Sequence, residues 1–131
     1  DGVRVIDMAE FRDRLLRLQA EVTASRWHHL RLLTERARGE DSGVKQFLVK
    51  YFGTTLGYRL SSLAVDVLGV AGLVYQPRGE AAEDDEATTW QIDYMYDIGL
   101  MIGGGTSQIQ KNIIAERGLG LPREPKAPGR G

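Results

Sequence analysis

The sequence contains no cysteine, and this absence excludes several kinds of chemistry at once. A disulfide framework, a thiolate nucleophile and a cysteine-based zinc or iron–sulfur site are all ruled out. Histidine is scarce too, with only His28 and His29 in 131 residues. Neighbouring residues on a helix point about 100° apart, so these two cannot bind one metal ion from one face. The Glu-x-x-His motif of di-iron helical bundles does not occur, and the sequence assigns no metal site.

An excess of charge of one sign is also missing. Seventeen basic residues against eighteen acidic ones leave a net charge of -1, so no overall field favours nucleic acid or an anionic membrane. No uncharged apolar run approaches the roughly 18 residues of a membrane span, and the first residues lack a signal-peptide pattern. The composition predicts a cytoplasmic protein with no nucleic-acid partner and no membrane span. A chain of 131 residues is expected to form one domain with its own core.

Apolar residues recur at three- and four-residue steps, with charged residues between them, and no segment alternates as a strand for long. The spacing predicts two long helices, over residues 7–38 and from about 41 to a stop at Gly69. Two shorter helices are predicted over residues 89–102 and from Thr106 onward. The expected fold class is therefore all-α, an antiparallel up-and-down helical bundle of about four helices that occupies residues 1–122.

Two segments are expected to lie outside the helices or the domain. Residues 76–89 contain Pro77 and the acidic run at 83–86, and they predict a solvated loop. Residues 123–131 are rich in proline and predict a flexible tail. The chain opens at Asp1 without a methionine, which favours a fragment of a longer protein.

Gly53 and Gly57 fall on one face of the second predicted helix, where each costs about 1 kcal/mol relative to alanine. Two explanations are open. Close approach of another helix would use the missing side chains, and so would a ligand that lies against the smooth patch.

The stretch "GGGTSQIQKNII", residues 103–114, places three glycines directly before a helix start. Thr106 is a good N-cap, and the residues after it have backbone N–H groups without an intrahelical partner. Gln108 adds a side-chain amide. The glycines could simply join two helices, or they could let the backbone approach an anion or the edge of a nucleotide. The residues alone leave both interpretations open.

Two stretches of this sequence resemble the acyl-CoA dehydrogenase family. "GGTSQIQKNIIAERGLGLPR", residues 104–123, is similar to the family's C-terminal signature, which reads Gly-Thr-Ser-Glu/Gln-Ile-Gln and then Ile-Ala-Glu-Arg. "VKYFGTTLGYRLSSLAVDVLG", residues 49–69, looks like its long helix, with Lys50, Phe52 and Arg59 at the usual spacing. The likeness covers most of residues 7–123. It implies the helical bundle that forms the C-terminal of three domains, in proteins that are usually tetramers.

The resemblance implies an FAD-dependent oxidoreductase of fatty acid metabolism. Such enzymes remove the α-proton of an acyl-CoA thioester with a carboxylate and pass the β-hydride to FAD, and the electrons leave through an electron-transferring flavoprotein. The resemblance assigns Thr106, Ser107 and Gln108 to contacts with FAD. It also assigns Gly69 to the cofactor of a neighbouring subunit, and Gly104 and Gly105 to the acyl-CoA substrate.

Departures from the family pattern limit what this chain can supply. Gly104 stands where many members carry the catalytic glutamate, so no residue here is assigned as catalytic, and the base is expected on a helix that would precede residue 1. Asp66 replaces the glutamine of the Gln-x-x-Gly-Gly motif, and only Gly69 of that motif is carried over. The activity is therefore expected of the full-length protein, with this chain inactive on its own.

Two alternative functions share this fold. The chain could be a non-catalytic helical interaction or oligomerisation module, or a non-catalytic subunit of a heteromeric dehydrogenase. The two long helices also carry apolar residues outside their main stripes, which predicts association into at least dimers, as a homo-oligomer (dimer or tetramer) or a heterotetramer. These residues are Leu16, Trp27, Leu30 and Leu33 on the first helix and Leu48, Tyr51 and Leu68 on the second.

Overall fold

The computed structural model describes residues 2–74, 86–123 and 125, and every regular element among them is helical. No strand occurs among them, so the all-α prediction is confirmed. The elements in chain order are η1 (Val5–Asp7), α1 (Ala9–Ala37), α2 (Lys45–Leu68), η2 (Gly69–Leu73), α3 (Glu86–Ile102), α4 (Ser107–Ile113) and η3 (Ile114–Gly118).

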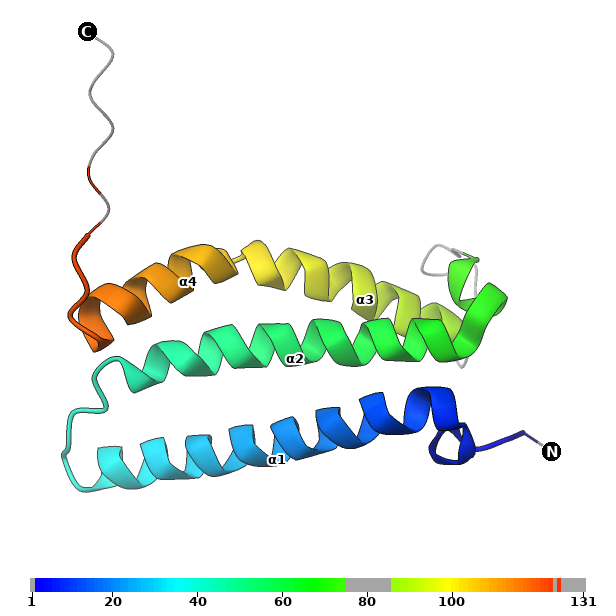
Figure 1. Ribbon diagram of the computed structural model, residues 1–131, viewed down its shortest axis with the longest axis horizontal. Helices are drawn as coiled ribbons and strands as arrows, with labels where there is room; N and C mark the ends of the chain where they lie inside the picture. Colours follow the sequence, from blue (N-terminus) through cyan, green and yellow to red (C-terminus); the bar gives the residue numbers. More distant parts are fainter. Residues whose placement is uncertain (1, 75–85, 124, 126–131) are drawn as a thin grey trace, which may run out of the picture.

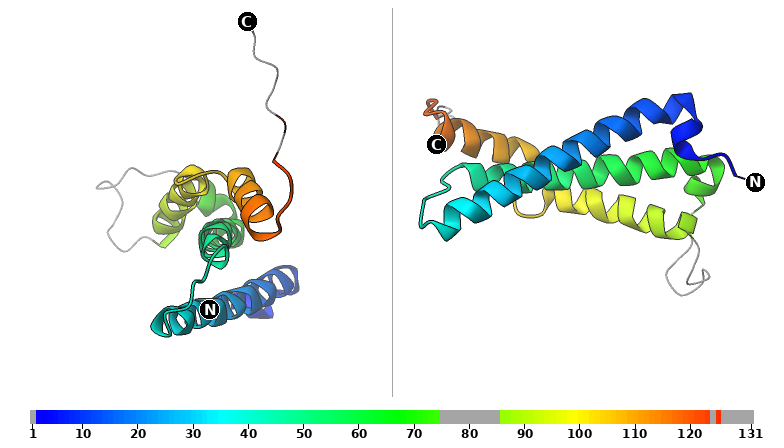
Figure 2. Two further views of the ribbon diagram at one scale, coloured as in Figure 1. Left: turned by 90° about the vertical axis from the view of Figure 1, so that its left-hand side faces the viewer. Right: turned by 90° about the horizontal axis from the view of Figure 1, so that it is seen from below.

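The central element of the bundle is α2. Figure 1 shows α1 running antiparallel along one side of α2, and α3 followed by α4 along the other side. The view along the helices in Figure 2 places α2 between these two layers. The predicted antiparallel bundle is present, and α3 and α4 follow one another in the same direction along α2. The turn between α3 and α4 lies against the first part of α2, where Lys50 reaches it (Figure 1).

The core of the described residues is small and lies between α1 and α2. Four apolar side chains are buried there, and Leu15 and Val67 pack against them. At about 25 cal/mol per Å² of apolar surface removed from water, these side chains give α1 most of its attachment to the bundle. The four buried residues are Phe11, Leu18, Leu56 and Leu63.

The helix boundaries agree with the periodicity to within a few residues, and glycine ends α2 as expected. Gly69 takes a φ of 57°, a left-handed conformation that suits glycine at a helix C-terminus. The third helix begins earlier than predicted, at Glu86, so part of the expected loop at 76–89 is helical. The rest of that loop, including most of the acidic run, lies outside the described residues, as does most of the predicted tail.

Only one of the two glycines on α2 is explained by close packing. A Cβ atom at Gly57 would lie 3.1 Å from Oδ1 of Asp97 on α3, so the missing side chain lets the two helices approach. The Ser61 hydroxyl donates to the same carboxylate at 2.9 Å, which anchors this contact. Gly53 is exposed, and a Cβ there would meet nothing within 4 Å among the described residues. The close-packing explanation is therefore wrong for Gly53.

By length and composition alone, the segment Lys45–Leu73 is long and apolar enough to cross a membrane. The prediction of no membrane span rested on uncharged runs alone and therefore missed this segment. Within the described residues, α1 lies on one side of it and α3 and α4 on the other (Figure 2). Its charged residues also have polar partners within the bundle. Lys50 donates to backbone carbonyls of α3, and Arg59 pairs with Glu21 of α1.

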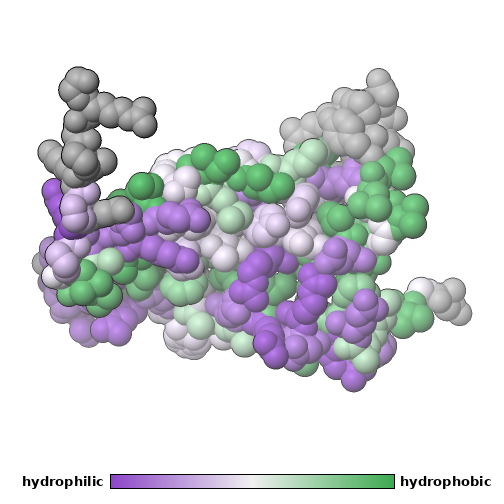
Figure 3. Space-filling model, turned by 45° about the horizontal axis from the view of Figure 1, so that its top comes forward, coloured by the Kyte–Doolittle hydropathy of each residue, from purple (hydrophilic) through white to green (hydrophobic). Residues whose placement is uncertain are grey.

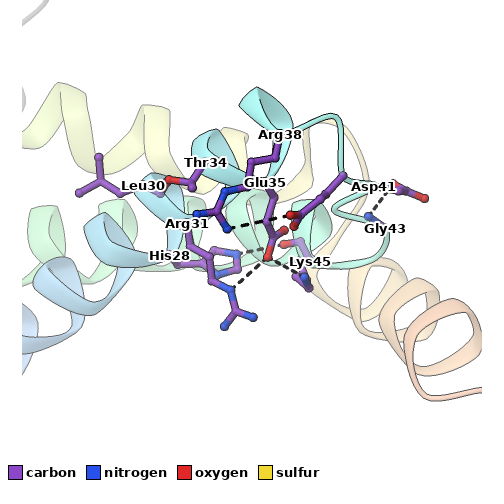
Figure 4. A network of polar contacts seen from close by, with 10 residues as sticks. His28, Leu30, Arg31, Thr34, Glu35, Arg38, Asp41, Gly43 and Lys45 are labelled. Carbon is purple, nitrogen blue, oxygen red and sulfur yellow. Dashed lines mark hydrogen bonds and ion pairs between the residues drawn. The ribbon is translucent and has the colours of Figure 1, made fainter.

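A buried carboxylate holds the α1–α2 connection together. Glu35 is 7% exposed near the end of α1, and its Oε1 accepts hydrogen bonds from Lys45 Nζ at 2.7 Å and Arg31 Nε at 3.1 Å. Figure 4 shows both cations directed at this carboxylate, with the Asp41–Gly43 turn beside it. The hydrogen bond from Lys45, followed by those from Arg31 and Ser42, lowers the pKa of Glu35 below its ordinary value against the opposing effect of burial.

The Glu35 cluster predicts a pH-dependent contribution to stability. A carboxyl pKa that is lower in the folded state stabilises the fold above the unfolded value of 4.5, and the contribution disappears as pH falls through the folded value. The difference in unfolding free energy between the parent chain and Glu35→Gln should therefore be complete near pH 7 and shrink below pH 4.5. Urea titrations at several pH values measure it. Glu40→Gln, at an exposed position in the same connection, is the control, and an equal effect of both substitutions would contradict the prediction.

Candidate functional site

The residues between α3 and α4 form a tight turn, which we call the glycine turn (Gly103–Gly105). Gly104 has a φ of 71° and Gly105 a φ of 99°, values that other residues rarely adopt. The N–H of Gly103 continues the helical pattern by donating to Gly99, and the N–H of Gly105 donates to Ile102 at 3.1 Å. Gly104 and Gly105 are therefore required by the backbone conformation of the turn itself.

Lys50 of α2 ties the glycine turn to the centre of the bundle. Its half-buried side chain extends toward the C-terminal end of α3, where Nζ donates to the carbonyl of Gly105 at 2.7 Å. The carbonyls of Leu100 and Met101 lie 3.3 Å and 3.5 Å from the same nitrogen. These two carbonyls belong to the last turn of α3, where a cation also interacts favourably with the helix dipole.

Gln110 of α4 holds the same turn from the other side. It is only 5% exposed, and its Nε2 donates to the carbonyl of Gly104 at 2.9 Å. A Cβ atom at Gly105 would lie 3.1 Å from this nitrogen, so a larger residue would push against the amide. Sequence reasoning singled out Gln108 and missed Gln110. Its position could have indicated this role, because Gln110 lies one helical turn after Thr106 and so on the side of α4 that faces the glycines.

The three residues predicted to contact a cofactor follow the glycine turn directly. Thr106 is the N-cap of α4, as predicted, and its Oγ1 accepts from the N–H of Ile109 at 3.3 Å. Its hydroxyl hydrogen is thus left free to act as a donor. Ser107 is half-buried and Gln108 is exposed, so both can reach a molecule outside the bundle. The structure brings these residues together with Gly104 and Gly105 at one place.

Gly69 lies far from this group. It ends α2, whereas Lys50, which donates to the glycine turn, lies 19 positions earlier on that helix, a separation of about 28 Å along its axis. Near Gly69, the Asp66 carboxylate accepts a hydrogen bond from Arg14 of α1 at 2.7 Å, so the residue that replaces the family's glutamine is engaged within the chain. One copy of the chain therefore presents the two predicted cofactor regions at separate places.

The histidines have structural roles. His28 Nε2 lies 3.1 Å from the carbonyl of Lys45, and His29 Nδ1 lies 2.7 Å from the carbonyl of Ser25. No group of three or more metal-ligating side chains occurs among the residues that the structure describes.

The fold and the site define an all-α bundle domain in which a glycine turn precedes the N-cap of α4. Comparison with known proteins shows the family to which this domain belongs. The family model described as "Acyl-CoA dehydrogenase, C-terminal domain" matches residues 1–119. The chain belongs to the acyl-CoA dehydrogenase family and corresponds to its C-terminal helical domain.

Two mycobacterial relatives show how much of such a protein the chain represents. It is 36% identical over 115 residues to acyl-CoA dehydrogenase IpdE1 of Mycolicibacterium smegmatis, which covers 88% of this chain and 26% of that protein. It is 28% identical over 127 residues to acyl-CoA dehydrogenase FadE26 of Mycobacterium tuberculosis, covering 93% and 30% respectively. The chain thus spans less than a third of the length of these relatives.

Solved structures share the fold. The structure titled "Tcur3481-Tcur3483 steroid ACAD" superposes with a TM-score of 0.74 at 23% identity, over 92% of this chain and 30% of that one. The ChsE4–ChsE5 complex from Mycobacterium tuberculosis gives a TM-score of 0.72 at 28% identity, over 94% of this chain and 31% of that one. The second title names a complex of two proteins.

Proposed function

We propose that this chain is the C-terminal domain of an FAD-dependent acyl-CoA dehydrogenase and that its glycine turn forms part of the FAD site. The observation that carries the proposal is the turn itself, which is held by Lys50 and Gln110 directly before Thr106. The residues fit such a group. Among the described residues, only Lys50 Cε lies within 4 Å of a Cβ position at Gly104, so the outer side of the turn is open to a large flat molecule.

In this proposal, Thr106, Ser107 and Gln108 hold the cofactor through two hydroxyls and an amide. When bound, FAD supplies the hydride acceptor for α,β-dehydrogenation of an acyl-CoA thioester. Gly104 and Gly105 present backbone to the substrate, and Gly69 approaches the cofactor of a neighbouring subunit. Gly104 has no side chain to remove the α-proton, so the base comes from a residue outside this chain and the chain alone is inactive. The full-length enzyme is cytoplasmic and passes electrons to an electron-transferring flavoprotein.

Substitutions at the start of α4 test the cofactor contact. In the full-length protein, Thr106→Val and Gln108→Ala should each weaken FAD retention about three- to tenfold, because each removes one hydrogen bond of about 0.5–1.5 kcal/mol. Release of flavin, followed by its fluorescence, measures the effect. The matched controls are Thr23→Val, at an exposed position of α1, and Gln46→Ala, at an exposed position of α2. Both should leave FAD retention unchanged. Parent-like FAD affinity in both Thr106→Val and Gln108→Ala would show that the glycines serve only as a connection between α3 and α4.

The surface of the chain supports association with another subunit. Trp27 and Leu33 of α1 are 67% and 61% exposed, and Leu16 and Leu30 on the same helix are exposed as well. Figure 3 shows further hydrophobic surface over the α3 layer and at the end of the bundle near η2, where Val70 and Leu73 are exposed. Exposed apolar patches of this kind are typical of interaction surfaces.

We expect the chain to form at least dimers at micromolar concentration, with about 1,000 Å² or more buried through α1 and α2. Sedimentation measures this, and substitution of both Trp27 and Leu33 by serine should shift the chain toward the monomer. A monomeric parent chain whose sedimentation does not depend on concentration would contradict the expectation.

A second candidate function is a non-catalytic subunit of a heteromeric dehydrogenase. Two observations favour it. Gly104 stands where many family members carry the catalytic glutamate, and Asp66, which replaces the glutamine of the Gln-x-x-Gly-Gly motif, is paired with Arg14. The two functions predict different amounts of FAD bound per subunit. Purified full-length protein without a partner should bind one FAD per subunit if it is a complete dehydrogenase, and fewer if it is a non-catalytic subunit. A non-catalytic interaction module would bind none.

A further inference from the structure

The glycine turn is held by two polar side chains from different helices, and each contacts a different carbonyl of the turn. Lys50 Nζ lies 2.7 Å from the oxygen of Gly105, and Gln110 Nε2 lies 2.9 Å from the oxygen of Gly104. Gln110 Oε1 is buried without a hydrogen-bond partner, so the amide is oriented by its Nε2 bond alone. No other side chain among the described residues donates a hydrogen bond to these two carbonyls.

These bonds oppose the intrinsic freedom of three consecutive glycines. Glycine gains more conformations than any other residue when it is released, so an untethered turn would populate many arrangements. Lys50 restricts these arrangements at two points, because its ammonium donates to the Gly105 carbonyl of the turn and to the last carbonyls of α3. With the ammonium removed, the Gly105 carbonyl and the end of α3 would both lose their donor.

We propose that Lys50 and Gln110 are positioning residues for the flavin: they hold the glycine turn in the conformation that places Thr106, Ser107 and Gln108 against the cofactor. The inference rests on the proposed function. Its energetic basis is that a ligand binds only the fraction of molecules with a competent site, so the apparent affinity falls in proportion to that fraction. Neither side chain needs to touch the flavin to change its affinity.

The experiment uses the full-length protein and two measurements on each variant. Hydrogen exchange of the flavin-free protein reports the order of the backbone amides at 103–110, and flavin fluorescence gives the FAD dissociation constant. Lys50→Met should raise the exchange rates about tenfold or more, and FAD binding should weaken in proportion to the fraction of molecules that loses the competent turn. Gln110→Leu should do the same to a smaller extent, and Lys50→Arg should restore part of both, because guanidinium also donates to carbonyls.

Two controls separate positioning from contact. Lys111→Met removes a lysine of α4 whose Nζ lies 5.4 Å from the centre of the Tyr51 ring, away from the glycine carbonyls, and it should change neither measurement. Gln108→Ala removes an exposed side chain and should weaken FAD binding without changing exchange. Far-ultraviolet circular dichroism confirms that each variant is folded, and Lys50→Arg retains the positive charge if Lys50→Met fails this check.

The outcomes distinguish the inference from the function on which it rests. Unchanged exchange in Lys50→Met overturns the inference. Faster exchange with parent-like FAD affinity also overturns it, and the proposed function then stands if Gln108→Ala still weakens FAD binding. If none of the Lys50, Thr106 and Gln108 variants changes FAD affinity, the flavin contact fails, and the positioning role fails with it.

Discussion

Replacement of Gly72 by alanine is expected to lower the free energy of unfolding of this chain by about 2–4 kcal/mol. A Cβ atom at Gly72 would lie 2.6 Å from the backbone oxygen of Val65, a distance that no side-chain adjustment can relieve. The residue is also buried, and its carbonyl accepts a hydrogen bond from the buried amide of Gln91 on α3. Movement of η2 to make room would break this bond between η2 and α3.

Urea denaturation measures the effect, and Gly53→Ala provides a control of opposite sign. Gly53 lies in the interior of α2 with open space around it, so alanine there should raise the unfolding free energy by about 0.5–1 kcal/mol. A loss of less than about 0.5 kcal/mol in Gly72→Ala would mean that η2 does not pack on α2 and α3 as the structure has it.

Leu63→Ala is expected to cost about 2–5 kcal/mol, the usual range for truncation of a buried leucine. Leu63 is 3% exposed and belongs to the buried set of four apolar side chains between α1 and α2. Because this set is small, its loss removes a large share of the apolar contact that attaches α1. The void left by the side chain would also border the hollow between α1 and α2 that Leu15 and Val67 line.

Leu60→Ala is the matched control, since Leu60 lies one turn earlier on the same helix and is 41% exposed. Its truncation should cost less than about 1.5 kcal/mol, because much of the side chain is already in water. Denaturant titrations of both variants under the same conditions make the comparison. Equal losses would indicate that the Leu60 face is covered, as it would be in an oligomer.

The sequence was sufficient for features that depend on local spacing. Periodicity located the helices to within a few residues, and Gly69 and Thr106 were recognised as the end of α2 and the start of α4 from the ordinary preferences of helix termini. These preferences act over four or five residues, so they can be read without knowledge of the neighbours in space. The family signature at 104–123 added the functional interpretation.

Features that depend on contacts between distant segments could not be predicted. The bond from Lys50 to Gly105 joins residues 55 positions apart, and the close contact at Gly72 follows from the way η2 folds back onto α2. Gly53 and Gly57 look equivalent in the sequence, yet only Gly57 has a helix against it. The order of α3 and α4 along one side of α2 likewise depends on the glycine turn, whose carbonyls accept hydrogen bonds from Lys50 and Gln110.

The central position of α2 gives the molecule two halves that can open independently. α1 packs chiefly on α2, whereas the bonds of Lys50 and Gln110 to the glycine turn join α2 and α4 to the end of α3, so α1 can detach without breaking them. Cooperative units of this kind open with their own free energies below that of global unfolding. A subunit that covers α1 would then slow exchange in α1 and leave the turn unaffected, and a flavin at the turn would do the reverse.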